Sequence, residues 1–170
     1  MRRGSGRKPR RVRRRDPRPF RTDHRPYLAP KKSVFSKIVG EPHAGGFELK
    51  FSRVLDDAPD VVAFAKNYLA VGFKIDYVKA DGDLSTYTRD FVVRSTDGTV
   101  WIVETKGRTE LDLPQKMTRL RQWCLDATAA SRAEGGPVYR FVYVDQEGYE
   151  RNSPQTFAAL AASFTEYQED

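Results

Sequence analysis

The spacing of hydrophobic residues changes along this chain and divides it into expected helices and strands. Apolar residues at positions 47, 51, 54 and 55 recur at the spacing of one helix face, which predicts a first helix there. Asp57-Ala58-Pro59 then predicts the start of a second helix, because proline is favoured in a first helical turn. The buried side of that second helix would be formed by Val61, Val62, Ala65, Tyr68 and Leu69.

Apolar and polar residues then alternate, which is typical of strands. The pattern predicts strands at residues 73–77, 87–94 and 100–106, with a turn at 80–83 between the first two. A long helix is expected from Leu113 to Arg132, with Asp112 and Gln115 at the spacing of a capping box. A strand over 139–144 and a final helix that begins at Ser153-Pro154 complete the pattern.

These elements predict an α/β fold with a mixed central sheet of about four strands flanked by helices. The long helix over 113–132 separates two strands, 100–106 and 139–144. A connection of this length allows the second strand to return parallel to the first.

Charge divides the chain into two expected parts. Residues 1–32 hold 14 Arg and Lys against Asp16 and Asp23, a net charge of +12, whereas the remaining residues hold 16 basic and 21 acidic groups, a net charge of −5. The Arg- and Pro-rich stretch 1–32 has too few apolar residues to bury a core, so it is expected to be a disordered basic tail. Residues 33–170 are expected to form the folded domain. Arg13, Arg14 and Arg15 are candidates for non-specific contact with DNA phosphates.

Composition also limits the kinds of site that the chain can hold. No apolar run approaches the roughly 20 residues that cross a membrane, and no apolar stretch follows the basic start as in a secretory signal. The single cysteine, Cys124, excludes an internal disulfide and fits a cytoplasmic protein. Two histidines and one cysteine do not supply the usual zinc ligands, so a bound metal ion would be held by oxygen atoms.

Three charged residues in two neighbouring strands are the candidate chemistry. Glu104 and Lys106 are two positions apart at the end of the strand 100–106 and therefore share one face. A three-residue loop, Thr96-Asp97-Gly98, would pair Ser95 with Thr99 and place Asp90 opposite Glu104, and glycine is favoured at its last position. A two-residue turn would instead turn Asp90 away from Glu104.

Two facing carboxylates repel unless a cation lies between them, and Mg²⁺ prefers such oxygen ligands. The arrangement predicts a Mg²⁺ site, with Mn²⁺ as a substitute, that lowers the pKa of a bound water beside a phosphodiester. Lys106 would orient that water or stabilise the transition state. A Glu-x-Lys pair taken alone is more often an exposed ion pair on an edge strand.

The segments Tyr87-Thr88-Arg89-Asp90-Phe91-Val92-Val93-Arg94 and Ile102-Val103-Glu104-Thr105-Lys106-Gly107-Arg108 resemble the PD-(D/E)XK nuclease signature. From about Tyr27 to Tyr167 the chain resembles the C-terminal endonuclease domain of type III restriction enzyme Res subunits. The resemblance also covers Val61 to Asn67, Leu120 to Cys124, and Tyr139 to Phe141. It implies a restriction-endonuclease-like core and Mg²⁺-dependent cleavage of double-stranded DNA.

The resemblance also assigns roles to single residues. Asp90 and Glu104 match the metal-binding acids, the backbone carbonyl of Thr105 a further ligand, and Lys106 the catalytic lysine. Glu48 falls where related nucleases often carry another acid, although it also fits a solvated helix carboxylate. Arg89 stands in place of the usual proline and is a candidate phosphate contact. Gln115 and Lys116 are candidates for contact with the DNA backbone, or simply surface residues at a helix start.

Several alternatives remain open from the sequence. The chain lacks the phosphate loop of the helicase motor that type III Res subunits carry. The resemblance therefore leaves three alternatives: a fragment, a split-gene product, or a freestanding nuclease whose basic tail anchors DNA. A separate helicase, ATPase or methyltransferase subunit is a candidate partner. Cutting both strands with one site per chain suggests paired copies. A DNA-binding or assembly module with a silent nuclease fold is the first alternative. A DNA repair or junction-resolving nuclease on the same core is the second.

Overall fold

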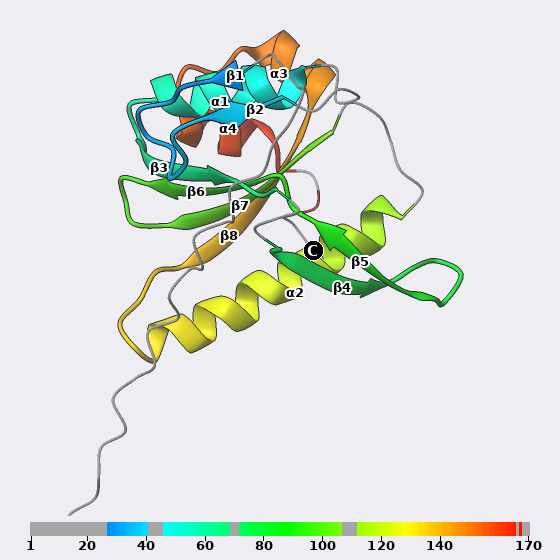
Figure 1. The fold of residues 1–170 in the computed structure, drawn as a ribbon. Coiled ribbons are helices and arrows are strands. Elements are labelled where there is room, and N and C mark those ends of the chain that lie inside the picture. The colour runs from blue at the N-terminus through cyan, green and yellow to red at the C-terminus, as the bar shows by residue number, and fades with distance from the viewer. Residues whose placement is uncertain (1–26, 41–45, 69–71, 107–111, 166, 168–170) are drawn as a thin grey trace, which may run out of the picture.

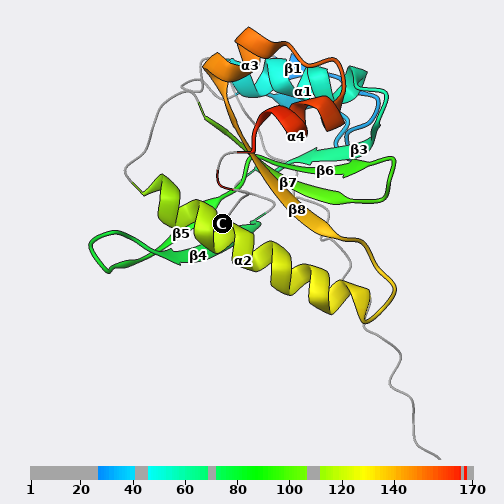
Figure 2. The ribbon, with the colours of Figure 1, turned by 180° about the vertical axis from the view of Figure 1, so that it is seen from behind.

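The computed structural model describes residues 27–40, 46–68, 72–106, 112–165 and 167, the side chain of Lys106 excepted. Its elements form three layers, with a four-stranded sheet as the middle layer. Helices α1 (Phe47–Asp57), α3 (Gln146–Asn152) and α4 (Phe157–Ser163) lie on one side, and α2 (Leu113–Arg132) lies on the other (Figures 1 and 2). The α/β prediction with a mixed sheet flanked by helices is therefore confirmed.

The central sheet has the strand order β3 (Val61–Lys66), β6 (Phe91–Ser95), β7 (Val100–Lys106), β8 (Tyr139–Asp145). The first three strands are antiparallel, and β8 runs parallel to β7 after the α2 crossover, as expected. The backbone N–H of Ser95 donates to the Thr99 carbonyl at 3.0 Å, and Gly98 has a φ of 86°. This is the predicted three-residue loop, and it fixes the β6–β7 register.

The face of the sheet toward α1 carries the larger hydrophobic core. Phe51 and Leu55 of α1 are fully buried against Phe91 of β6 and Val103 of β7. The aromatic rings of Phe51 and Phe91 lie 5.4 Å apart, centre to centre. Helix α4 adds Leu160 and other apolar side chains to the same core, so α1 and α4 together cover this face.

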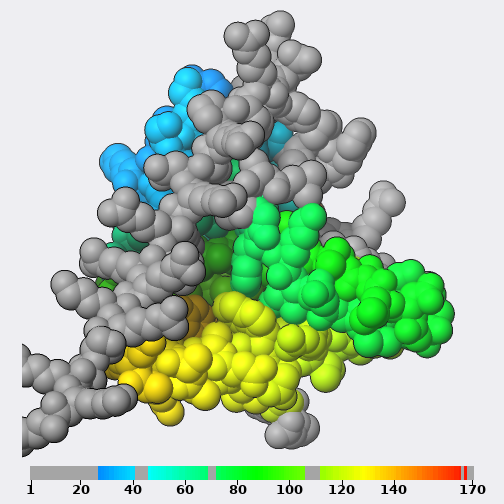
Figure 3. All heavy atoms as spheres, turned by 60° about the horizontal axis from the view of Figure 1, so that its bottom comes forward, coloured from blue at the N-terminus to red at the C-terminus, as the bar shows by residue number. Residues whose placement is uncertain are grey.

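The opposite face packs against α2 and a separate hairpin. Strands β4 (Lys74–Val78) and β5 (Leu84–Thr88) pair only with each other within the described chain, and Figure 3 shows this hairpin beside α2. The core of this side joins Ile75 of β4, Tyr87 of β5 and Ile102 of β7 to Leu120 and Cys124 of α2. The long helix predicted over Leu113 to Arg132 is therefore confirmed, and one of its faces packs on the sheet.

The predicted second helix is wrong, because residues 61–66 form the edge strand β3. Val61, Phe64 and Ala65 are buried, a pattern that fits either element when only a few residues are considered. Pairing with β6 decides for the strand. The outer edge of β3 is also paired, since Val34 N–H donates to the Phe64 carbonyl and Phe64 N–H to the Lys32 carbonyl.

The single strand predicted over 87–94 is two strands in the structure. β5 ends at Thr88 and β6 begins at Phe91, with a bend at Asp90 between them. This break directs β5 into the hairpin on the α2 side and leaves β6 in the central sheet (Figure 1). Arg89 and Asp90 therefore form a junction between two sheets rather than the middle of a strand.

Helix starts differ from the expected ones. Asp112 forms no side-chain cap on α2, so the predicted capping box with Gln115 is not made. Helix α3 was not predicted, and its cap is the Asp145 carboxylate, which accepts from Gly148 N–H at 2.6 Å. Thr156, rather than Ser153-Pro154, caps α4. Its hydroxyl accepts from Ala159 N–H at 3.1 Å.

The folded part begins before residue 33, where the sequence had placed its boundary. Strand β1 (Tyr27–Leu28) pairs with β2 (Ile38–Val39). The backbone N–H groups of Lys31 and Lys32 donate to the Asp56 carboxylate at 2.8 and 2.7 Å. The rest of the expected tail, with Arg13, Arg14 and Arg15, lies outside the described residues. No helix in the described ranges has the length and apolar character to cross a bilayer.

Candidate acid site at the junction of β5 and β6

The register of the central hairpin brings the two predicted acids to one end of the sheet. Phe91 pairs with Val103. One more step along both strands sets Asp90 against Glu104. Lys106 is the last residue of β7, and its side chain lies outside the described residues. The predicted register of β6 and β7 is therefore confirmed as far as Phe91 and Val103.

Asp90 lies in the bend before β6 and its carboxylate faces β7. Its Oδ2 accepts from both the backbone N–H and the hydroxyl of Thr105, each at 2.6 Å. The main chain of the bend is held by Asn67, whose N–H donates to the Asp90 carbonyl at 2.7 Å. The Asn67 side-chain amide donates to the carbonyls of Arg89 and Phe73, at 2.9 and 2.7 Å. Asn67, directly after β3, thus holds the backbone of the bend, and Thr105 of β7 holds the carboxylate.

Glu48 of α1 is the second acid of this site. It forms an ion pair with Lys66 of β3, whose side chain is 2% exposed against 14% for Glu48. Burial, followed by the charge of Glu48, raises the pKa of Asp90 to about 6, although the Thr105 bonds and the charge of Lys66 act in the opposite direction. Glu48 and Asp90 therefore act on each other across the α1 face of the sheet.

Glu104 belongs to the other face of the sheet. Along β7, Val103 packs in the α1-side core and Ile102 in the α2-side core, so alternation places Thr105 with Val103 and Glu104 with Ile102. Asp90 is bonded to the Thr105 hydroxyl and thus turns toward α1. The expectation that Asp90 and Glu104 converge on one face is therefore wrong in this structure, because the bend at Asp90 interrupts the strand alternation.

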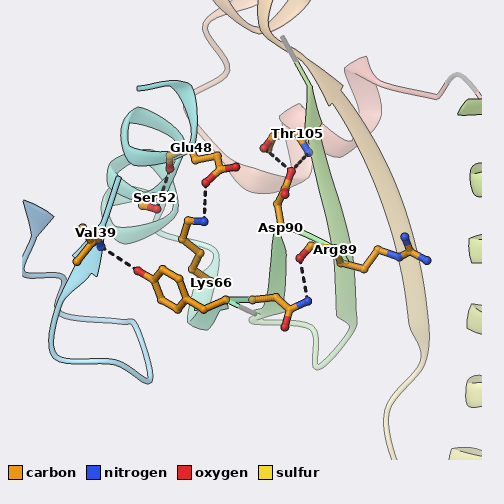
Figure 4. A network of polar contacts seen from close by, with 9 residues as sticks. Val39, Glu48, Ser52, Lys66, Arg89, Asp90 and Thr105 are labelled. Carbon is orange, nitrogen blue, oxygen red and sulfur yellow. Dashed lines mark hydrogen bonds and ion pairs between the residues drawn. The ribbon is translucent and has the colours of Figure 1, made fainter. Parts of the chain in front are cut away.

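Arg89 takes the direction that a regular strand would have given Asp90. Figure 4 shows Arg89 pointing away from Glu48 and Lys66. Its guanidinium lies over the Tyr87 ring and is fully buried. Burial lowers the pKa of Arg89 to about 9, with the charge of Glu104 as the main opposing influence, so the group stays protonated at neutral pH. Arg89 is not exposed for the phosphate contact expected of it.

The remaining predicted DNA contacts lie at the start of α2. The Lys116 ammonium is 5.4 Å from the centre of the Tyr87 ring and 5.5 Å from that of Tyr77. Gln115 and Lys116 are both half-buried. They lie on the Glu104 and Arg89 side of the sheet rather than beside Asp90.

The oxygen ligands that the α1 face offers are of the kind that a hard divalent cation binds. Mg²⁺ is commonly held by one or two carboxylates together with water, and Glu48 and Asp90 supply two carboxylates. Burial and the charge of Glu48 raise the pKa of Asp90, so the ionised carboxylate is disfavoured in this corner without a neighbouring cation. Across the described residues, no group of three or more His, Cys, Asp and Glu side chains is arranged to hold a metal ion. The fit is therefore to an acid pair, and Glu104 stays a predicted ligand.

Sequence reasoning missed Lys66 and Asn67, which are both buried. Lys66 forms the ion pair with Glu48, and the Asn67 N–H donates to the backbone carbonyl of Asp90. The reason is the mistaken helix over this segment, which hid that residue 66 pairs with Phe91 beside the bend. The available signal in the sequence was a lysine followed by an asparagine at the end of an apolar run.

A groove of about 620 Å³ adjoins the acid site, because Lys66 and Asn67 are among the residues that line it. Phe73, Val92 and Trp123 also line it, whereas Glu48 and Asp90 do not. The rings of Phe73 and Trp123 meet edge to face at 5.2 Å. The lining is mainly apolar and contains no acid, so the groove adds no carboxylate to the site.

Comparison with known proteins gives no further support for an assignment. No family model, no curated protein and no solved structure matches this chain. The resemblance to type III restriction nuclease domains stays a prediction from the residues that carry it.

Proposed function

We propose that this chain is a metal-dependent endonuclease domain that hydrolyses phosphodiester bonds in double-stranded DNA. The observation that carries the proposal is the meeting of Asp90, from the β5–β6 junction, with Glu48, from α1, at the end of the β6–β7 hairpin. The restriction-endonuclease-like core and the relation to type III restriction enzymes are parts of the same proposal. They rest on the sequence motifs together with this placement.

In this proposal the chain's residues bind and orient rather than form a covalent intermediate. Glu48 and Asp90 are the carboxylates that hold Mg²⁺ or Mn²⁺. A divalent cation held there would supply a more acidic water and positive charge beside the phosphodiester. Thr105 holds one oxygen of Asp90 with two hydrogen bonds, which leaves the other oxygen as the free ligand atom.

Glu104 and Lys106 end the neighbouring strand and keep their predicted roles as acid and catalytic lysine. Joining Asp90 and Glu104 around one cation requires the Arg89–Asp90 bend to turn the Asp90 carboxylate toward the α2 face. The acid pair on the α1 face requires no such change. The two arrangements differ in which acid, Glu48 or Glu104, is indispensable.

Plasmid nicking with Mg²⁺ tests the proposal and separates these arrangements. The variants are Glu48→Gln, Asp90→Asn and Glu104→Gln, with Asp126→Asn on the exposed face of α2 as a matched control. Loss of nicking in the first two alone supports the α1-face pair, and loss in all three supports a site that includes Glu104. Equal nicking by all variants, or none by the wild-type protein with either metal, contradicts the proposal.

One observation favours a second candidate, a nuclease-fold module that binds DNA or a partner without cutting it. Lys66 already neutralises Glu48, and Glu104 lies beside Arg89 on the other face, so each acid has a protein cation near it. DNA binding by gel shift in EDTA, with no cleavage when Mg²⁺ or Mn²⁺ is added, would support this candidate. A repair or junction-resolving nuclease would instead cut branched DNA in preference to linear or nicked DNA.

A further inference from the structure

The last residue of β3 bears on both acids of the site. Lys66 is fully buried in the sheet edge, and its ammonium forms an ion pair with the Glu48 carboxylate. The same ammonium lies 4.9 Å from the centre of the Tyr68 ring, whose hydroxyl accepts from Val39 N–H at 2.8 Å. The Lys66 ammonium thus lies between Glu48 of α1 and the Tyr68 ring, which is itself bonded to Val39 of β2.

The position of Lys66 along β3 brings it to the Asp90 bend as well. Lys66 pairs with Phe91, the residue after Asp90. Asn67, which follows Lys66, donates its backbone N–H to the Asp90 carbonyl. Figure 4 shows Lys66, Glu48 and Asp90 gathered on one side of the strands, with Thr105 beyond Asp90. One positive charge therefore faces two negative charges in a largely buried corner.

We propose that Lys66 is a positioning residue of the acid site, which holds Glu48 beside Asp90 and competes electrostatically with a divalent cation for the two carboxylates. The inference rests on the proposed metal site, though not on DNA cleavage. Two half-buried carboxylates that face each other without a counter-charge would repel each other and separate. Lys66 keeps them together in the metal-free protein, and the cation must overcome the repulsion of the ammonium in order to bind.

This role and that of a purely structural ion pair predict opposite changes in metal affinity when Lys66 is removed. Removal of a purely structural lysine would loosen the site and weaken metal binding. Removal of a competing positive charge strengthens metal binding, because the repulsion between the ammonium and the divalent cation disappears. DNA cleavage would fall in both cases, since Glu48 is no longer held in place.

The measurement is Mn²⁺ binding by calorimetry to the wild-type protein, Lys66→Met and Lys66→Arg, with folding checked by circular dichroism. We expect Lys66→Met to bind Mn²⁺ about tenfold more tightly than the wild type, and Lys66→Arg to bind as the wild type does. Equal or weaker binding by folded Lys66→Met overturns the inference. No binding by the wild-type protein overturns the metal site and the inference together.

Because Lys66→Met leaves Glu48 buried without its ion pair, that variant can fail to fold. The comparison is then made between Glu48→Gln and the double variant Glu48→Gln with Lys66→Met, in which the loss of Lys66 no longer leaves an unpaired carboxylate at position 48. The double variant is expected to bind Mn²⁺ more tightly than Glu48→Gln alone. The reverse order contradicts the competition between Lys66 and the cation.

Discussion

Asp90 and Thr105 are joined twice, since one carboxylate oxygen of Asp90 accepts from both the backbone N–H and the hydroxyl of Thr105 at 2.6 Å. Thr105 is the residue between Glu104 and Lys106, so the acid of one strand is held by the middle position of the Glu-x-Lys motif in the next. The Asp90 carboxylate thereby accepts from the Thr105 N–H, which would donate to the β6 backbone if that strand continued regularly through this position. It also turns Asp90 toward α1.

Asp90→Asn is expected to stabilise the metal-free protein at neutral pH. The folded pKa of Asp90, about 6, lies above its unfolded value, so the ionised carboxylate opposes folding once the pH rises through that range. The stabilisation should be on the order of 2 kcal/mol at pH 7.5 and should vanish below about pH 4, where the acid is protonated in both states.

Urea unfolding in EDTA at pH 4, 6 and 7.5 measures this difference for the wild-type and variant proteins. The amide oxygen of the introduced asparagine can still accept from Thr105, so the hydrogen bonds are kept. A variant that is less stable than the wild type at pH 7.5 would show that the ionised Asp90 carboxylate does not destabilise the fold.

Thr105→Val should raise the pKa of Asp90 further. The hydroxyl bond to the carboxylate lowers that pKa, and valine removes the hydroxyl while it keeps a similar volume. Carbon-13 NMR titration of the Asp90 carboxyl group gives the pKa directly. Thr105→Ser keeps a hydroxyl and is the control, so equal pKa values in the valine and serine variants would contradict the role of this bond.

Asn67→Ala should destabilise the fold and the acid site together. The variant removes two side-chain donors, to the carbonyls of Arg89 and Phe73, in a residue that is 5% exposed. The loss in unfolding free energy should be about 2 to 3 kcal/mol. Asn152→Ala, at the exposed end of α3, is the matched control with little expected effect.

Cys124 should be unreactive in the folded protein. Burial raises the pKa of its thiol to about 12, against a smaller lowering influence from Arg89, so almost no thiolate exists at pH 8. Mass spectrometry after iodoacetamide treatment should show no modification under native conditions and complete modification in urea. Rapid native labelling would mean that α2 does not stay packed on the sheet.

Hydrophobic spacing was sufficient to predict α1, α2, β7 and β8, because each carries a long or strongly periodic apolar pattern. The register of β6 and β7 also followed from local chemistry, since Gly98 suits the left-handed position of a three-residue loop. Those features placed the backbones of Asp90 and Glu104 opposite each other.

The side-chain directions at the site could not be read in the same way. They depend on the bend at Asp90, which Asn67 holds from a strand that local propensity had suggested to be a helix. Lys66 was missed for the same reason, because its pairing with Phe91 of β6 is what brings it beside the Asp90 bend. Contacts between segments distant in sequence, rather than local pattern, decided these positions.

The carboxylate of Asp60, just before β3, accepts from the backbone N–H groups of Phe157 and Ala158 at 2.8 and 2.7 Å. The first turn of α4 is thereby anchored to a residue almost a hundred positions earlier, and Phe157 covers Trp101 with ring centres 5.6 Å apart. During synthesis, the part of this apolar face that α4 covers therefore stays exposed until nearly the whole domain has left the ribosome. A chain truncated before this helix would expose Trp101 and is expected to aggregate rather than accumulate as a stable shorter domain.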